Sequence, residues 1–306
     1  MGKYVIRRLL QMIPVAIGTT FLIFAMVFAT GDPLDGRCGE RPCSAAYATA
    51  FTKEYHLDQP LPVQYGFYMS KLVQGDLGTN FFGNKVSEEL LVRYPTTITL
   101  ALIAVAFELV IGILAGVLTG IRRGGFLDNL VLISTLVLIS IPIFVIGALA
   151  QLIFGVQLGL FPITATQGTF EQLILPGMVL GSVSVAYVAR LTRGNVAENL
   201  RSDYVRTAKA KGLTPGRVVG VHTLRNSLIP VITFIGADLG TLMGGAIVTE
   251  RIFNINGVGG FIFRSIAQRD GTSVVGAVTI LVVIFLLANL LVDILYGVLD
   301  PRISND

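Results

Sequence analysis

Six long stretches of this sequence are almost free of charged side chains, and this feature constrains the fold more than any other. They cover residues 9–29, 96–121, 130–154, 172–189, 227–249 and 273–299. About 20 consecutive apolar residues make a helix long enough to cross the roughly 30 Å hydrocarbon core of a membrane. Because lipid offers no hydrogen-bond partners to the backbone, each stretch is expected to be an α-helix. The sequence therefore predicts an all-α integral membrane protein with about six transmembrane helices.

The composition agrees with this prediction. Of the 306 residues, 53% are hydrophobic and 14% are charged, whereas a soluble domain carries about 25% charged residues. The first stretch is too long for a signal peptide, has no evident small-residue cleavage site and is followed by five more stretches. We therefore expect one transmembrane domain over residues 1–306.

Lysine and arginine residues predict the orientation of the chain. If the N-terminus is cytoplasmic, the cytoplasmic segments hold most of the 23 basic residues, and the external ones lie mainly in one long loop that counts little for orientation. Both termini are then cytoplasmic, residues 30–95 and 250–272 are external, and residues 190–226 form a basic cytoplasmic loop. This charge fits topology and contact with anionic lipid. Nucleic-acid binding is not expected without a basic soluble domain.

The sequence lacks the motifs of a chain that would supply its own energy or catalysis. It has no G-x-x-x-x-G-K-[ST] phosphate loop and no H-E-x-x-H motif. Its only histidines, His56 and His222, fall on opposite sides of the membrane in this topology. The spans hold three acidic and no basic residues, fewer ionisable groups than an ion-coupled carrier usually buries. We therefore expect no cofactor or metal bound by this chain, and an energy source in a partner.

A short helix, a glycine hinge and a second helix are predicted within residues 203–216 of the cytoplasmic loop. Ser202 or Asp203 can cap the first helix, and Gly212 can end it in the left-handed conformation. Thr214 then offers a second N-cap, followed by Pro215 at the favoured first helical position. An ordinary basic connector is the alternative, but two capped helices are more order than a connector needs.

The sequence from Tyr204 to Pro230 resembles the coupling loop of ABC importer permeases, and most closely the B-type permeases of the peptide and nickel transport family. It begins Tyr-Val-Arg-Thr-Ala-Lys-Ala-Lys-Gly-Leu and ends His-Thr-Leu-Arg-Asn-Ser-Leu-Ile-Pro. Arg206, Thr207 and Ala208 occupy the positions of the general Glu-Ala-Ala signature, and Gly212 is its glycine. The first of these positions departs from the general signature in the way that this branch usually does.

The resemblance extends over nearly the whole chain. Further matching segments are residues 4–14, 31–33, 57–65, 75–78, 250–259 and 296–303, with Asn256 where proline is common. Their order and spacing together make the resemblance specific. It implies a bundle like that of a type I ABC importer permease, in the bacterial inner membrane.

The resemblance also implies partners and a set of coupling residues. The partners would be a second related permease, two ATPase subunits that bind ATP and Mg, and an external solute-binding protein. This chain would form half of the translocation path for dipeptides or oligopeptides. The residues expected to couple it to the ATPase are Tyr204, Val205, Arg206, Thr207, Ala208, Lys211, Gly212 and Leu213. Apolar contacts from Tyr204, Val205 and Leu213 are expected to outweigh surface ion pairs, which contribute about 0–1 kcal/mol.

Other functions stay open from the sequence. The same architecture would serve for nickel or another small solute, because the external binding protein makes the first selection. An ATP-independent secondary carrier would be a different class, but it does not explain the ordered cytoplasmic loop. A membrane enzyme is a further alternative, for which no nucleophile, base and metal constellation is present.

Two acidic residues within the spans are candidates for the wall of the translocation path. An Asp at the centre of a membrane helix costs about 2.5–3.5 kcal/mol, so it should face protein or water. Asp238 would attract the amino terminus of a peptide, or it would make a helix–helix hydrogen bond permitted by its small neighbours. Glu108 has the same two interpretations. Asp293 is expected to be structural.

The external segment over residues 250–272 is glycine-rich yet apolar. It is expected to pack against protein, because irregular backbone at a membrane must be buried or line a cavity, and to form a short helix over residues 260–268. Phe253, Gly257, Val258 and Gly259 are candidates for an outer gate that also docks the solute-binding protein. A hydrophobic hairpin that only seals the last two spans is an equal alternative.

The two cysteines, Cys38 and Cys43, both lie in the predicted external loop. Thiols outside the cytoplasm tend to oxidise, and the four intervening residues can turn tightly enough to bring the two together. A disulfide is therefore expected, with free thiols or a metal site as alternatives.

Overall fold

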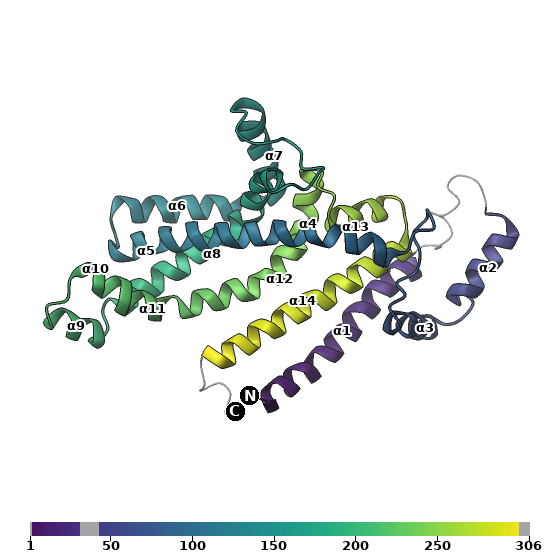
Figure 1. The fold of residues 1–306 in the computed structure, drawn as a ribbon, viewed down its shortest axis with the longest axis horizontal. Coiled ribbons are helices and arrows are strands. Elements are labelled where there is room, and N and C mark those ends of the chain that lie inside the picture. Colours follow the sequence, from purple (N-terminus) through teal and green to yellow (C-terminus); the bar gives the residue numbers. More distant parts are fainter. Residues whose placement is uncertain (1, 31–42, 300–306) are drawn as a thin grey trace. The chain divides into compact units, whose positions relative to one another are not determined.

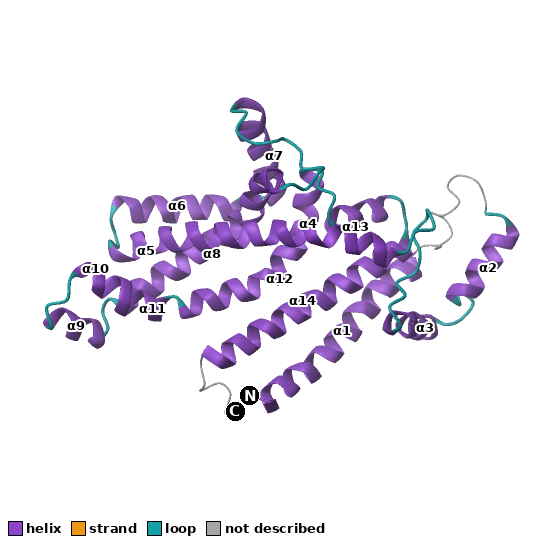
Figure 2. Cartoon of the chain, viewed as in Figure 1, coloured by secondary structure: helices purple, strands orange, loops and turns teal. Residues whose placement is uncertain are grey.

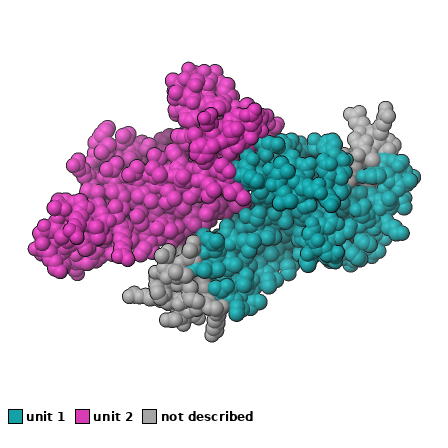
Figure 3. Space-filling view, in the orientation of Figure 1, with its two compact units in different colours: residues 1–97, 256–306 teal, residues 98–255 magenta. Residues whose placement is uncertain are grey.

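The computed structural model describes residues 2–30 and 43–299, and residues 1, 31–42 and 300–306 lie outside the described part. Within the described part, the elements are helices, with one isolated β-bridge between Thr79 and Lys85 and no strand (Figure 2). This confirms the all-α prediction. The chain divides into two compact units, residues 1–97 with 256–306 and residues 98–255 (Figure 3), which are described separately.

The described helices include five that are long and apolar enough to cross a membrane. They cover Val5–Ala29, Val86–Ile121, Phe170–Asn199, Ile229–Ile252 and Gly271–Ile294. The prediction of one continuous helix over residues 130–154 is wrong, because two helices meet here at 106°. Pro142 cannot donate a backbone hydrogen bond and disfavours a helical residue before it, and Ile141 is indeed extended. The described residues therefore hold five candidate spans, or six if this bent pair is one broken span.

The first unit is built on two long helices. It contains α1 (Gly2–Thr30), α2 (Ala45–Tyr55), α3 (Leu61–Val73), the start of α4 (Val86–Phe107), α13 (Val258–Ala267) and α14 (Gly271–Leu299). Helices α1 and α14 pack along each other (Figure 1). An ion pair of 3.4 Å between Arg8 and Asp293 joins them, which gives Asp293 the structural partner that the sequence analysis expected.

Tyrosines of α3 fix this helix to both long helices of the first unit. The Tyr65 hydroxyl lies 2.7 Å from Thr20 Oγ1 on α1. The Tyr68 hydroxyl donates to Thr279 Oγ1 on α14 at 2.9 Å, and burial raises the pKa of Tyr68 to about 12. Phe24 packs its ring on Tyr65 and Tyr68. The predicted external loop therefore contains a helix that is anchored on the bundle.

The second unit surrounds a central helix, α8. Its elements are the end of α4, η1 (Glu108–Gly112), α5 (Ile113–Ile121), α6 (Phe126–Ser140), α7 (Ile143–Ala150), η2 (Gln151–Gln157), α8 (Phe170–Asn199), α9 (Asp203–Ala210), α10 (Pro215–Arg217), η3 (Val218–Thr223), α11 (Leu224–Ser227) and α12 (Ile229–Ile252), where η marks a π-helix. Helix α8 contacts α5, α6, α7, α11 and α12. Of its most apolar stretch, 72% is buried within the protein.

A ladder of glycines lets α8 approach η1 and α5 closely. A Cβ atom added to Gly112, Gly116 or Gly120 would lie 2.6, 2.4 or 2.9 Å from side-chain atoms of Val188, Thr192 and Val196, respectively. These distances are too short for non-bonded carbon atoms, so any larger residue would push the helices apart. Small residues at four-residue spacing are a common device for close helix packing in membranes.

Helix α8 continues well beyond the predicted end of its apolar stretch at Ala189. An ion pair holds this extension, because Arg193 Nη2 donates to Asp128 Oδ2 at 2.8 Å and the Asp128 side chain is 1% exposed. The amide of Gly124 also donates to Asp128, at 2.7 Å. Residues 190–199 of the predicted cytoplasmic loop are therefore part of a long helix.

Candidate functional site

The segment that follows α8 has the predicted order of helix, glycine hinge and helix. Helix α9 ends at Ala210, and Gly212 has a φ angle of +78°. Thr214 is the extended N-cap residue before Pro215, the first residue of α10. Ser202 is the N-cap residue of α9, as predicted, but its hydroxyl donates to the carbonyl oxygen of Asn199. Neither Ser202 nor Thr214 makes a side-chain cap hydrogen bond.

One face of α9 is buried against the helix that follows the hinge. Val205 is 0% exposed and packs with Ala208 and Val218, and Leu213 covers this cluster. The expected apolar contact between Val205 and a partner protein therefore does not fit the structure, since this side chain is already used inside the chain. Tyr204 is more accessible and donates from its hydroxyl to Asn199 Oδ1 at 2.6 Å.

The other face of α9 is open to solvent. Arg206, Thr207, Lys209, Lys211 and Gly212 are exposed. Asp203 and Arg206 form a 3.5 Å ion pair in which both side chains are largely exposed. The segment thus presents a basic surface that is backed by a small apolar cluster.

The two candidate acids for the translocation path lie next to each other in the second unit. Ser184 on α8 donates a hydrogen bond to Asp238 Oδ2 on α12. The Glu108 side chain, at the first position of the π-helix η1, is close enough to interact with both Asp238 and Ser184. Glu108 is completely buried, and neither of its carboxyl oxygens has a hydrogen-bond partner within the described residues. Both interpretations offered for Asp238 thus find support, because it bonds another helix and also borders a groove.

This groove has a volume of about 330 Å³ and lies on the surface of the second unit. Its polar lining is Ser184, Asp238 and Thr241, and its apolar lining includes Tyr187 and Phe234. A few polar groups in a largely apolar concave surface are typical of small-molecule sites.

The glycine-rich segment over residues 250–272, which was predicted to be external, is packed against protein as expected. Phe253 and Ile255 are buried in the core of the second unit. In the first unit, α13 begins at Val258, two residues before the predicted start. The amide of Val258, a fully buried residue, donates to Thr97 Oγ1 at 2.9 Å. Gly257 is the extended N-cap residue of α13.

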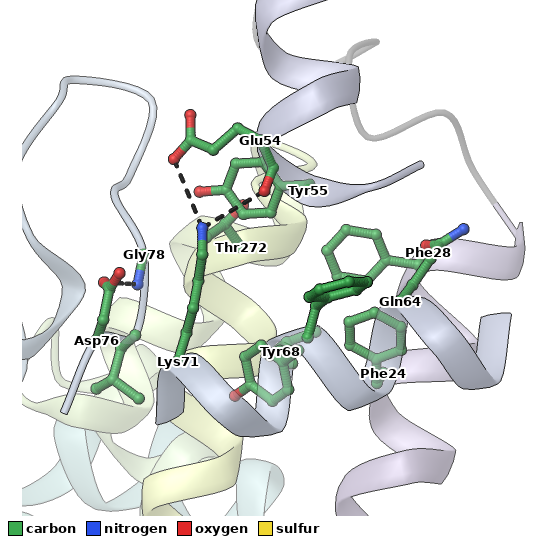
Figure 4. Close-up of a pocket in the computed structure, with 13 residues that line it drawn as sticks. Phe24, Phe28, Glu54, Tyr55, Gln64, Tyr68, Lys71, Asp76, Gly78 and Thr272 are labelled. Atoms are coloured by element: carbon green, nitrogen blue, oxygen red, sulfur yellow. Dashed lines mark hydrogen bonds and ion pairs between the residues drawn. The ribbon is translucent and has the colours of Figure 1, made fainter. Parts of the chain in front are cut away.

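The first unit also contains an aromatic cavity between α1, α3 and α14 (Figure 4). Lys71 reaches across it to Glu54, with 3.9 Å between Nζ and Oε1, and lies over the ring of Tyr55. The aromatic cavity has a volume of about 30 Å³, which is room for one or two water molecules. We therefore regard it as part of the packing of α3, since a peptide cannot enter it.

The predicted Cys38–Cys43 disulfide lies outside the described residues, because Cys38 belongs to the segment 31–42. It stays a prediction.

Comparison with known proteins resolves which kind of protein has this arrangement. Residues 109–305 match the family described as binding-protein-dependent transport system inner membrane components, and residues 1–101 match the N-terminal family of the same membrane components. The chain belongs to this transport family. It is therefore a permease subunit, a multi-pass membrane protein that acts within a transporter complex, as the resemblance of its predicted cytoplasmic loop indicated.

Several relatives match this permease over its full length. A dipeptide transport system permease protein of Alkalihalophilus pseudofirmus is 38% identical, with 99% of this chain and 100% of the relative covered. A di/tripeptide permease protein of Pseudomonas aeruginosa is 38% identical, with coverage of 100% and 99%. A glutathione permease protein of Pectobacterium atrosepticum is 36% identical, with 99% of each covered.

The permease also contains features that the sequence analysis missed. The glycine ladder repeats every four residues from Gly112 to Gly120, a small-residue spacing that would have predicted close packing of α5. The Asp128–Arg193 ion pair and the role of Ser184 carry no comparable signal, because polar residues at helix ends and single serines are common.

Proposed function

We propose that this permease forms half of the translocation path of an ATP-driven importer of short peptides, which an external solute-binding protein delivers. The observation that carries the proposal is the likeness, at 36–38% identity over the full length, to permease proteins named for dipeptides, di/tripeptides and glutathione. The partners in this proposal are a second related permease and two ATPase subunits, which bind ATP and Mg. The chain itself is proposed to have no ATPase site.

In this proposal the α9 segment couples the permease to an ATPase subunit. The exposed residues Tyr204, Arg206, Thr207, Lys211 and Gly212 would contact the ATPase. Val205, Ala208 and Leu213 would hold α9 against η3, so that it moves as one body. A rigid helix on a short connection can transmit the closure of the ATPases as a tilt of the membrane helices.

Transport by the purified complex tests this function. The complex of this permease with its partner permease and ATPases is reconstituted in liposomes. A radiolabelled dipeptide and the binding protein are added outside, and the liposomes are prepared with or without ATP inside. ATP-dependent dipeptide accumulation is expected. Accumulation without ATPase subunits would instead favour a secondary carrier, and accumulation of Ni²⁺ but not dipeptide would move the substrate class to metal ions.

The proposed topology places both termini and α9 in the cytoplasm and residues 30–95 outside. A cysteine introduced at Lys85 should react with a membrane-impermeant thiol reagent in intact cells, in a background where Cys38 and Cys43 are replaced. A cysteine at Lys209 should react only after the cells are opened. The reverse labelling pattern would overturn the topology.

We also propose that Phe253, Gly257, Val258 and Gly259 belong to an outer gate that docks the solute-binding protein. The burial of Val258 and its bond to Thr97 equally support a seal between the last two spans. The substitution Val258→Trp separates the two roles. An assembled complex that docks its binding protein weakly supports the gate, and failure to assemble supports the seal.

A further inference from the structure

The polar groove beside Asp238 is followed along α8 by a second groove of opposite character. We call the first the acidic groove, defined by Ser184, Asp238 and Thr241 of its lining. The second, the basic groove, has a volume of about 470 Å³. Its lining is Arg123, Arg190, Leu191, Gly194, Asn195, Ala197, Glu198 and Arg201. Both grooves lie within the second unit.

The two grooves occupy one face of the same helix. Ser184 and Tyr187 line the acidic groove, and Leu191, Gly194 and Glu198 line the basic groove. Residues that alternate three and four positions apart form one stripe along an α-helix. The distance from Ser184 to Gly194 is about 15 Å along the axis, at 1.5 Å per residue.

Each groove presents polar atoms to a bound cargo. At the acidic groove these are the carboxylate oxygens of Asp238, one of which accepts a hydrogen bond from Ser184. At the basic groove they are Arg190 Nη2 and Asn195 Nδ2, which are buried and have no hydrogen-bond partner among the described residues, although Arg190 Nε donates to Thr135 Oγ1 at 3.1 Å. Leaving a buried donor unpaired is unfavourable. The acidic groove thus offers acceptors to a cationic group, and the basic groove offers donors to an anionic group.

We infer that this face of α8 gives a zwitterionic peptide two successive stations, the acidic groove for its α-ammonium group and the basic groove for its α-carboxylate. The inference rests on the proposed function and adds how the path recognises its cargo. Arginine suits the second station because its planar donors match a carboxylate. Glu198 within the basic groove reduces the net positive charge there, so the cargo is held weakly enough to leave.

The spacing of the stations requires that a dipeptide meets them one after the other. An extended chain advances about 3.3–3.6 Å per residue, so the charged ends of a dipeptide lie only about 7 Å apart. This is half of the distance between Ser184 and Gly194. A free amino terminus and a free carboxylate would each matter at a different stage of passage.

Tethered charges at accessible positions test the two stations. Thr241 is exposed in the acidic groove, and Thr241→Lys places an ammonium one helical turn from Asp238, where it competes with the cargo. Gly194 has no atom within 4 Å of an added Cβ, so Gly194→Asp places a carboxylate in the basic groove without steric conflict. The matched controls Thr241→Gln and Gly194→Asn have similar size and no charge.

The experiment measures ATP-dependent dipeptide uptake by reconstituted complexes, with binding-protein-stimulated ATP hydrolysis as a second readout. We expect each charged variant to take up dipeptide about five- to tenfold more slowly than its neutral control, as one unfavourable charge in a partly solvated groove would cause. Stimulated ATP hydrolysis should persist, so fewer peptides are moved per ATP.

Three outcomes would be decisive against the stations. Equal uptake by charged and neutral variants would overturn them, and so would slowing by the neutral variants alone. Failure of both Gly194 variants to assemble would show that another chain fills the basic groove. If the unmodified complex moves no dipeptide, the proposed function itself fails, which separates that result from a failure of the stations.

Discussion

Helices α8 and α9 follow each other in the chain but are held in place in different ways. Helix α8 is buried among five other helices and touches η1 and α5 through glycine contacts. Helix α9 is held by one small cluster around Val205 and Ala208. The bend between them is short and hydrogen-bonded, since the amides of Arg201 and Ser202 donate to Glu198 and Asn199. A force on α9 can therefore be transmitted to α8 without first unfolding the residues that connect them.

The largest effect is expected from the α8 contact. The substitution Gly116→Val should prevent accumulation of folded permease, because even a Cβ at this position would lie 2.6 Å from the carbonyl oxygen of Ala189. Overpacking of a core typically costs 1–3 kcal/mol or more. The amount of monodisperse protein extracted from membranes measures this effect. Gly244→Val on α12 is the control, since no atom lies within 4 Å there, and equal yields of the two variants would show that the ladder is not tightly packed.

The next largest effect is expected at the small cluster of α9. Ala208→Trp should leave the α8 bundle folded, with an unchanged thermal midpoint for the isolated permease, because Ala208 packs only with Val205, Val218 and Leu213 in its cluster. The bulky ring should displace α9 and reduce co-purification of the ATPase and dipeptide uptake at least about tenfold. Normal uptake by a fully assembled Ala208→Trp complex would count decisively against the coupling role.

A smaller effect is expected at the hinge. Gly212→Ala places a Cβ on a residue with a φ angle of +78°, which costs about 1–2 kcal/mol for a residue other than glycine. Uptake should fall a fewfold, and Gly212→Pro should have a larger effect because its φ angle cannot be positive. Gly216→Ala, in α10 and with open space around it, is the matched control. Equal uptake by the two alanine variants would show that the hinge conformation is not needed.

The smallest effect on stability is expected on the exposed face of α9. Arg206→Gln removes an ion pair with Asp203 in which both side chains are largely exposed, and such pairs contribute little. The thermal midpoint of the isolated permease should not change. A clear loss of stability would mean that α9 is held by more than its apolar cluster.

The sequence predicted those parts of the structure that depend on neighbouring residues in the chain. The positions of five spans follow from uninterrupted apolar stretches, and the hinge follows from Gly212 between two capping patterns. The 106° bend was missed because a proline within an apolar stretch is compatible with a straight membrane helix. Whether the helix bends at Pro142 depends on the residues that pack around it, which the sequence does not identify. The length of α8 was missed for a similar reason. An arginine such as Arg193 after an apolar stretch is typical of a loop outside the membrane, and the sequence does not show that Asp128 pairs with it.

The sequence identified several residues of the candidate site but not how they are arranged in space. Asp238 and Glu108 were both identified by the cost of an acid within a membrane span, yet nothing in the sequence places them side by side with Ser184. Val205 was assigned to an outer surface because it belongs to the coupling motif. Its position on the inner face of α9 depends on the packing of Val218, which is separated from it by the hinge.

The glycine ladder also determines how deformation spreads through the second unit. Side chains that meet side chains can take up a small shift by changing rotamer, but a glycine has no side chain that can adjust. A tilt of α8 at Val188, Thr192 and Val196 must therefore carry η1 and α5 with it. Glu108 is the first residue of η1 and Ser184 is on α8, so the ladder keeps these two groups in register during the tilt. Glu108 and Ser184 would then keep one mutual geometry throughout the transport cycle, and a change in the acidic groove would have to come from α12, which carries Asp238 and Thr241.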